Sequence, residues 1–106
     1  MYRFSAAVLL LLALAPSVQA ETQSGQIEAG REIADRLCAR CHAVGAEGES
    51  PHEEAPPFRT FAEKWPVEHL EEALAEGITV GHPDMPEFVL QPDEIASFIA
   101  YLNSLD

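Results

Sequence analysis

The feature that most constrains this chain is the pentapeptide Cys38-Ala39-Arg40-Cys41-His42. On a helical turn, two cysteines three residues apart point in the same direction, so both sulfurs can react with one edge of the same group. His42 follows the second cysteine directly, and an imidazole is a strong ligand for a metal held by that group. The chain has no other cysteines, so it cannot build a disulfide scaffold.

The string C-x-x-C-H is the attachment site of a c-type haem, where the two thiols add to the two vinyl groups and the histidine binds the iron. Three other interpretations exist. A thioredoxin-like redox pair needs a βαβ pattern, which is absent, and a zinc site lacks a second cysteine pair. A plain structural disulfide leaves the following histidine unexplained. We therefore expect one haem c, bound covalently through Cys38 and Cys41 and ligated by His42.

Residues 1–20 have the layout of a secretory signal peptide. Arg3 precedes an unbroken apolar run over residues 6–15, and Val18-Gln19-Ala20 places small residues before a cleavage point. The run is too short to span a bilayer comfortably, although an uncleaved membrane anchor is the alternative interpretation. We expect cleavage after Ala20, export to the periplasm, no stable membrane insertion afterwards, and one domain over residues 21–106.

Charge and size exclude further classes of protein. The chain has 6 basic and 18 acidic residues, with a formal net charge of −12, so a nucleic-acid backbone would repel it. Removal of residues 1–20 from the 106 residues leaves 86. A domain of this size buries a thin core and often needs a staple, which a covalently bound haem would supply.

Hydrophobic periodicity predicts helices and no alternating strand. The predicted helices cover residues 24–41, residues 66–76, and a C-terminal segment that starts at Pro92. Two stretches rich in proline and glycine, 43–60 and 78–91, are predicted as loops. The expected fold class is therefore all-α, with three to four short helices and long loops that wrap one bound group.

Taken together, the motifs resemble those of a small class I cytochrome c from the bacterial periplasm. The resemblance runs from Gly30 to Leu105 and rests on four strings: Cys38-x-x-Cys41-His42, Ala55-Pro56-Pro57-Phe58, Gly81-His82-Pro83-Asp84-Met85-Pro86-Glu87-Phe88 and Ile99-Ala100-Tyr101-Leu102. It implies a cytochrome c domain over residues 21–106, with the haem in a pocket that the loops enclose. It also implies that the first and last helices cross at a small residue, Gly30, opposite Phe98, Tyr101 and Leu102. The family has an aromatic residue near the position of Ala34, which this sequence lacks.

Met85 is the expected second ligand of the iron. It is the only methionine left once Met1 is removed, and Met85-Pro86 matches the ligand loop of the family. Ligation by His42 and Met85 raises the reduction potential relative to two histidines. A methionine that fills the core is the alternative interpretation, and His82, three residues earlier, is the alternative ligand.

Other residues resemble family positions around the haem. Pro56 resembles the proline whose carbonyl accepts a hydrogen bond from the proximal histidine, although a simple loop breaker is an equal interpretation. Trp65 either donates its indole N–H to a haem propionate or merely lines the pocket. Three phenylalanines are expected to pack against the haem: Phe58, Phe61 and Phe88. Two histidines are expected at the surface: His52 and His69.

An iron with two protein ligands has no open site for a substrate, so this pattern favours a periplasmic electron carrier and not an enzyme. The carrier would be a monomer that shuttles single electrons between redox partner proteins. The expected donor is a dehydrogenase or a bc1-type complex, and the expected acceptor is an oxidase or a reductase. The alternatives are a ligand-binding or sensory haem protein with a labile Met85 ligand, and a disulfide-bearing interaction module without haem.

Overall fold

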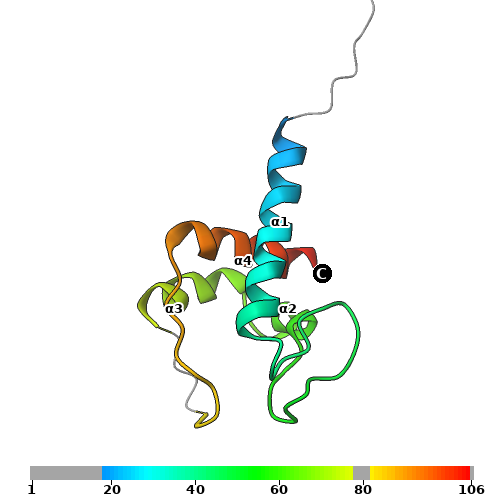
Figure 1. Ribbon diagram of the computed structural model, residues 1–106, viewed down its shortest axis with the longest axis vertical. Helices are drawn as coiled ribbons and strands as arrows, with labels where there is room; N and C mark the ends of the chain where they lie inside the picture. The colour runs from blue at the N-terminus through cyan, green and yellow to red at the C-terminus, as the bar shows by residue number, and fades with distance from the viewer. Residues whose placement is uncertain (1–17, 78–81, 106) are drawn as a thin grey trace, which may run out of the picture.

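The computed structural model describes residues 18–77 and 82–105 (Figure 1). These residues form helices and no strand, which confirms the predicted all-α class. Residues 1–17 of the expected signal peptide, and Gly81 of the second loop motif, lie outside the described residues. The elements in chain order are α1 Val18–Leu37, η1 Phe58–Thr60, α2 Phe61–Lys64, η2 Val67–His69, α3 Leu70–Glu76 and α4 Pro92–Ser104.

The first helix differs from its predicted bounds of 24–41 at both ends. It is already helical at Val18, upstream of the predicted start at residue 24, and no proline lies between Pro16 and Pro51 to interrupt it. The expected cleavage after Ala20 therefore falls within a helical segment. It ends at Leu37, and the chain continues in tight turns in which the Cys38 carbonyl accepts the N–H of Cys41 and of His42.

The structure also differs from the prediction at residues 58–60 and 66–76. Residues 58–60, predicted as loop, form the helical turn η1, where the Thr60 N–H and hydroxyl both bond the Pro57 carbonyl and Phe58 is buried. The helix predicted over 66–76 divides into η2 and α3, and Pro66 lies just before its first turn. Gly77 ends α3 with φ of 106°, a backbone conformation that favours glycine.

The last helix starts at Pro92, as predicted, and its first turn is closed by a bond from the Gln91 N–H to Glu94 Oε1 at 3.0 Å. Its apolar face is buried along its length through five residues: Ile95, Phe98, Ile99, Tyr101 and Leu102. These side chains join Ile33 and the fully buried Ala34 of α1 in one hydrophobic core. The core therefore lies where α1 and α4 pack together.

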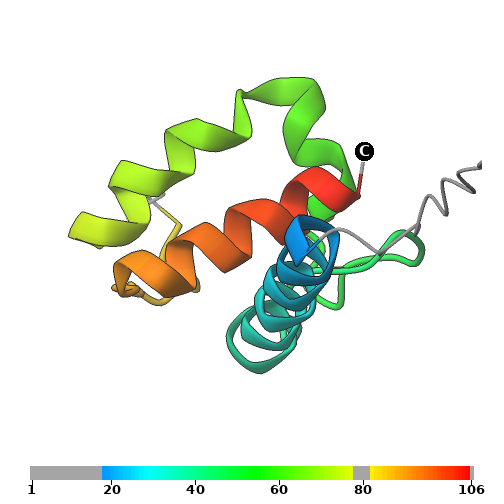
Figure 2. The same cartoon turned by 90° about the horizontal axis from the view of Figure 1, so that it is seen from above.

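Helices α1 and α4 cross near the middle of α1, at Gly30 (Figures 1 and 2). A Cβ added at this glycine would lie 2.0 Å from the Ser97 carbonyl oxygen and 2.7 Å from Tyr101 Cβ. The predicted crossing at Gly30 opposite Tyr101 is thus confirmed, and the nearest group is the backbone of Ser97. Only glycine allows the two helices to come this close.

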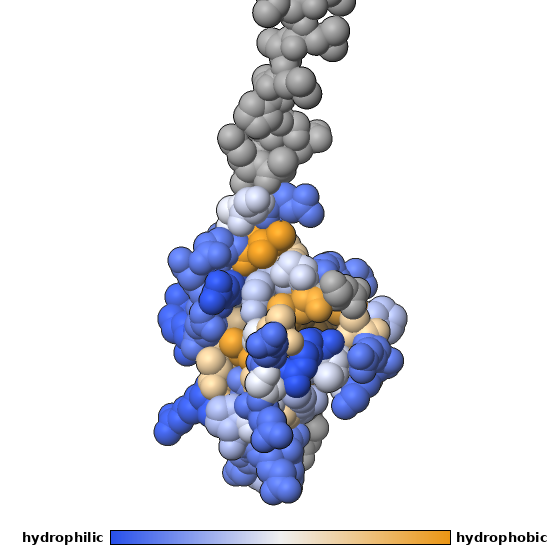
Figure 3. Space-filling model, turned by 90° about the vertical axis from the view of Figure 1, so that its right-hand side faces the viewer, coloured by the Kyte–Doolittle hydropathy of each residue, from blue (hydrophilic) through white to orange (hydrophobic). Residues whose placement is uncertain are grey.

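On the face shown in Figure 3, hydrophilic residues surround a smaller group of hydrophobic ones. Arginine ion pairs lie at the surface of the described part of the chain, Arg31 with Asp35 and Arg36 with Glu94. Across residues 18–77 and 82–105, no helix combines the length and the apolar character that a membrane crossing requires.

Candidate functional site

A cavity of about 730 Å³ lies below the helical core, between the end of α1, η1, α2, α3 and the loop of residues 82–91. Its volume falls within the roughly 300–1,000 Å³ that is usual for small-molecule and cofactor sites. The side chains that line the cavity are largely apolar. Four of its lining residues are the ones that sequence analysis proposed as haem-binding: Cys38, Cys41, His42 and Met85.

The turn that follows α1 places the C-x-x-C-H residues at the cavity. The Cys38 N–H still bonds the Ala34 carbonyl at 2.9 Å, and the His42 N–H bonds the Cys38 carbonyl at 2.9 Å. The two cysteines are free thiols and both are half-buried. Burial raises the pKa of the Cys38 thiol to about 11, so this thiol is protonated at neutral pH.

The His42 ring is held by a backbone carbonyl. Its Nδ1–H donates to the Pro56 oxygen at 2.8 Å, because a carbonyl can only accept. This confirms the hydrogen bond expected from the resemblance. The bond fixes the tautomer, leaving Nε2 as the nitrogen with a free lone pair for a metal.

The loop that carries Pro56 is hydrogen-bonded to the backbone around the C-x-x-C-H motif. The His52 N–H donates to the Cys41 carbonyl at 3.0 Å, and the Phe58 N–H donates to the Ala43 carbonyl at 2.9 Å. Because both bonds join the loop to residues next to His42, the Pro56 carbonyl is held in place by backbone contacts on either side.

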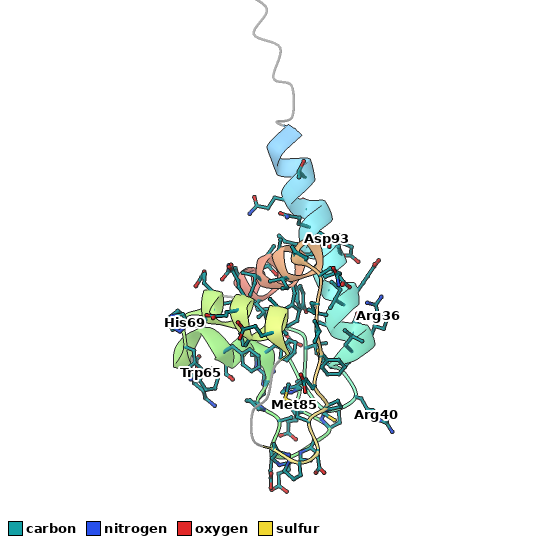
Figure 4. All side chains as sticks on the ribbon, turned by 90° about the vertical axis from the view of Figure 1, so that its left-hand side faces the viewer. Arg36, Arg40, Trp65, His69, Met85 and Asp93 are labelled. Carbon is teal, nitrogen blue, oxygen red and sulfur yellow. The ribbon has the colours of Figure 1, made fainter. Side chains whose placement is uncertain are left out.

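Met85 reaches the same cavity from the second loop. It is half-buried, and its N–H bonds the His82 carbonyl at 3.2 Å. The loop is anchored to α3 by a bond from the Leu90 N–H to the Leu74 carbonyl at 2.9 Å. Figure 4 shows Met85 below the helices, between Trp65 on one side and Arg40 on the other.

His82, the alternative ligand, also lines the cavity, but its Nε2 is hydrogen-bonded to Glu54 Oε2. Its Nδ1 accepts the N–H of Asp84 at 3.2 Å. Both ring nitrogens are therefore engaged with protein groups, whereas the Met85 sulfur has only its place in the cavity wall. This arrangement favours Met85 over His82 as the partner of His42.

An aromatic wall closes one side of the cavity. The Phe58 ring contacts Phe61 at a centroid distance of 4.8 Å and His42 at 5.0 Å. Phe88 is half-buried and also lines the cavity, as expected. Trp65 lines the cavity too, with 53% of its surface exposed, a position that both of its predicted roles share.

The surface histidines differ from each other. His69 is exposed, as predicted. His52 is half-buried and its Nε2 pairs with Asp84 Oδ2 at 3.1 Å, a contact that sequence reasoning missed. The only signal for it was the similar order of histidine and acid in His52-Glu53-Glu54 and His82-Pro83-Asp84.

The residues present fit a haem c. Two half-buried thiols, an oriented imidazole with a free Nε2 and a thioether share one apolar cavity. Imidazole and thioether are ligands that haem iron takes in electron-transfer proteins.

Comparisons with known proteins agree with this geometry. Residues 25–102 match the family model described as cytochrome C oxidase, cbb3-type, subunit III. The chain is 31% identical over 98 residues to cytochrome c-552 of Bradyrhizobium diazoefficiens, covering 92% of this chain and 91% of that protein. It is 30% identical over 81 residues to a cytochrome c-553-like protein of Synechocystis, covering 76% and 70%. No solved structure matches the chain.

Proposed function

This chain belongs to the class I c-type cytochromes, within the family described as cytochrome C oxidase, cbb3-type, subunit III, and we propose how it performs haem-based electron transfer. The haem c is attached covalently through Cys38 and Cys41, and its iron is ligated by His42 and Met85. The observation that carries this assignment is the His42 Nδ1–H bond to the Pro56 carbonyl, which frees Nε2 in the cavity that Met85 also lines.

When bound, the haem iron supplies a one-electron couple between its ferrous and ferric states. The residues around the haem would set its ligand geometry and its reduction potential. The Pro56 carbonyl holds the His42 ring still and increases the basicity of its Nε2. The Met85 thioether is a soft ligand that favours the ferrous state and so raises the reduction potential. Phe58 and Phe61 pack around His42 and exclude water from it.

A haem iron held by both His42 and Met85 would have no open site for a substrate, so the protein would carry electrons and catalyse no bond chemistry. We place it in the periplasm as a monomer, after cleavage behind Ala20, with a donor dehydrogenase or bc1-type complex and an acceptor oxidase or reductase as partners. The net charge of the whole chain, −12, supports partners with a basic docking face, which such an acidic surface attracts.

The test compares Met85→Ala with His82→Ala in haem-loaded protein purified from the periplasm. The wild type should show a low-spin reduced spectrum that carbon monoxide leaves unchanged, and the weak long-wavelength ferric band of methionine ligation. Met85→Ala should keep its colour because the thioethers remain. It should lose that band, bind carbon monoxide and have a lower reduction potential, by on the order of 0.1 V within the ~0.8 V that axial ligands span.

His82→Ala serves as the control and should leave the spectrum unchanged. If the wild type lacks the methionine band and His82→Ala changes the spectrum instead, His82 is the ligand. A wild-type protein that binds carbon monoxide directly would be a ligand-binding or sensory haem protein. A protein without haem would contradict the proposal altogether.

A further inference from the structure

A second group of ligand-type side chains lies between the two loops that border the cavity, at the end of the molecule remote from the start of α1 (Figure 1). Each loop contributes a histidine and an acid two residues later: His52 with Glu54, and His82 with Asp84. The pairs are exchanged between the loops. His52 Nε2 bonds Asp84 Oδ2 at 3.1 Å, and His82 Nε2 bonds Glu54 Oε2.

Three of the four donor groups converge, and the fourth, Glu54, is hydrogen-bonded to His82. One nitrogen of His52, one nitrogen of His82 and one carboxylate oxygen of Asp84 all lie within 4.8 Å of one another. The two imidazole rings are nearly perpendicular, with centroids 5.3 Å apart. Metal–ligand distances of about 2.0–2.2 Å put two ligands of a tetrahedral ion roughly 3.4 Å apart. The separations therefore have to contract by at most about 1.4 Å, from 4.8 to 3.4 Å.

We propose that His52, His82, Asp84 and Glu54 form a binding site for one divalent transition-metal ion, of the zinc or copper type. Two imidazoles and two carboxylates are a ligand set that suits these ions and no alkaline-earth ion. Two neutral rings and two carboxylates carry a charge that one divalent cation balances, and the chain as a whole is strongly acidic. The side chains are 31–67% exposed, so an ion reaches them directly from solvent.

The backbone hydrogen bonds to the two histidine rings show which ring nitrogens carry protons before an ion binds. Nδ1 of His52 accepts the Glu54 N–H at 3.1 Å, and Nδ1 of His82 accepts the Asp84 N–H at 3.2 Å. In the neutral ring the proton is therefore on Nε2, facing the carboxylates. When an ion takes the Nε2 positions, the proton of each ring moves through solvent to Nδ1. Both backbone bonds are long and exposed, so exchanging them for bonds to water costs little.

Occupation of this site would connect the two loops through the ion. None of its four ligands belongs to the set proposed for the haem, but all four line the same cavity, and Asp84 immediately precedes Met85 in the chain. An ion that binds the folded protein and not the unfolded chain stabilises the fold by mass action. We therefore expect it to hold the Met85 loop against the loop of residues 43–57.

The experiment titrates Zn²⁺ into haem-loaded protein by calorimetry, since the thiols of a haem-free chain would themselves bind zinc. The wild type should bind one ion, and Zn²⁺ should raise its thermal midpoint. His52→Ala and His82→Ala should each weaken binding at least tenfold and lose the rise in midpoint. His69→Ala is the matched control, because His69 is an exposed histidine outside the group, and it should behave as the wild type.

Cu²⁺ provides an independent readout by electron paramagnetic resonance. Coupling to two imidazole nitrogens is expected in the wild type and coupling to one in His52→Ala. No binding of Zn²⁺ at sub-millimolar concentration, or equal affinity in all four proteins, would refute the site. His52→Ala tests the site independently of the haem ligands. If His82→Ala changes the haem spectrum as the loss of an iron ligand would, His82 Nε2 belongs to the haem, and both the proposed Met85 ligation and this site are refuted.

Discussion

The substitution Gly30→Ala in α1 tests the tight crossing of α1 and α4 directly. An alanine Cβ at this position would lie 2.0 Å from the Ser97 carbonyl oxygen and 2.6 Å from the Ser97 carbonyl carbon. Ordinary contacts begin at about 3.4 Å, so α1 and α4 would have to separate by more than about 1 Å. Backbone cannot rotate away as a side chain can, and five buried residues of α4 would lose contact together.

The expected change in the free energy of unfolding is the sum of two opposing contributions. Overpacking of a well-filled core costs about 1–3 kcal/mol, and a clash with backbone belongs at the upper end of this range. Alanine gains about 1 kcal/mol over glycine in a helix interior. The net loss for Gly30→Ala is then about 2 kcal/mol, which lowers the Tm of a domain of this size by roughly 8–16 °C.

Gly25 provides the matched control in the same helix. A Cβ added at Gly25 meets nothing within 4 Å, so Gly25→Ala keeps the gain in helix propensity without a clash. Its free energy of unfolding should rise by at most about 1 kcal/mol. Thermal and denaturant unfolding of the haem-loaded variants, followed by circular dichroism, measure both. A Gly30→Ala protein as stable as Gly25→Ala would show that the helix crossing is not as tight as described.

Three further predictions concern the hydroxyl of α4, the attachment site and the surface charge. Tyr101→Phe removes the bond from the Tyr101 hydroxyl to the Val44 carbonyl at 2.5 Å and should cost about 1 kcal/mol in denaturant unfolding, with an unchanged visible spectrum; no loss would mean that the bond contributes nothing. A double variant, Cys38→Ala with Cys41→Ala, should be largely unfolded without its haem, and a cooperative thermal transition in that protein would contradict the idea that haem completes the core. Electron transfer to a partner with a basic face should slow as ionic strength rises, because salt screens the attraction between exposed charges beyond about 8 Å at physiological ionic strength. Stopped-flow rates that stay flat or increase would show that the acidic surface does not steer docking.

The sequence predicted best what depends on neighbours along the chain. The start of α4 at Pro92 and its buried face follow from a local repeat of apolar residues, and both are confirmed. The bond from His42 to Pro56 was foreseen only through the resemblance to a family, because no local pattern relates two residues 14 positions apart.

The sequence predicted least where tertiary contacts decide. The turn η1 forms because Phe58 is buried against Phe98 and Phe61, which a run of prolines and polar residues does not reveal. The exchange of partners between His52 and Asp84 joins residues 32 positions apart and depends on how two loops fold back. Both histidines had simple local interpretations as surface and loop residues, and so their pairing was not predicted.

The burial of Cys38 has a consequence for the order of events during assembly. A thiolate is the reactive form of cysteine, and a rise in pKa from about 9 to about 11 lowers its fraction at neutral pH about a hundredfold. In the unfolded chain the same thiol has its ordinary pKa and is open to solvent. If the haem is attached through Cys38, as we propose, attachment should therefore be faster before the chain folds than after. A chain that folds first would have buried the thiol that is to receive the haem.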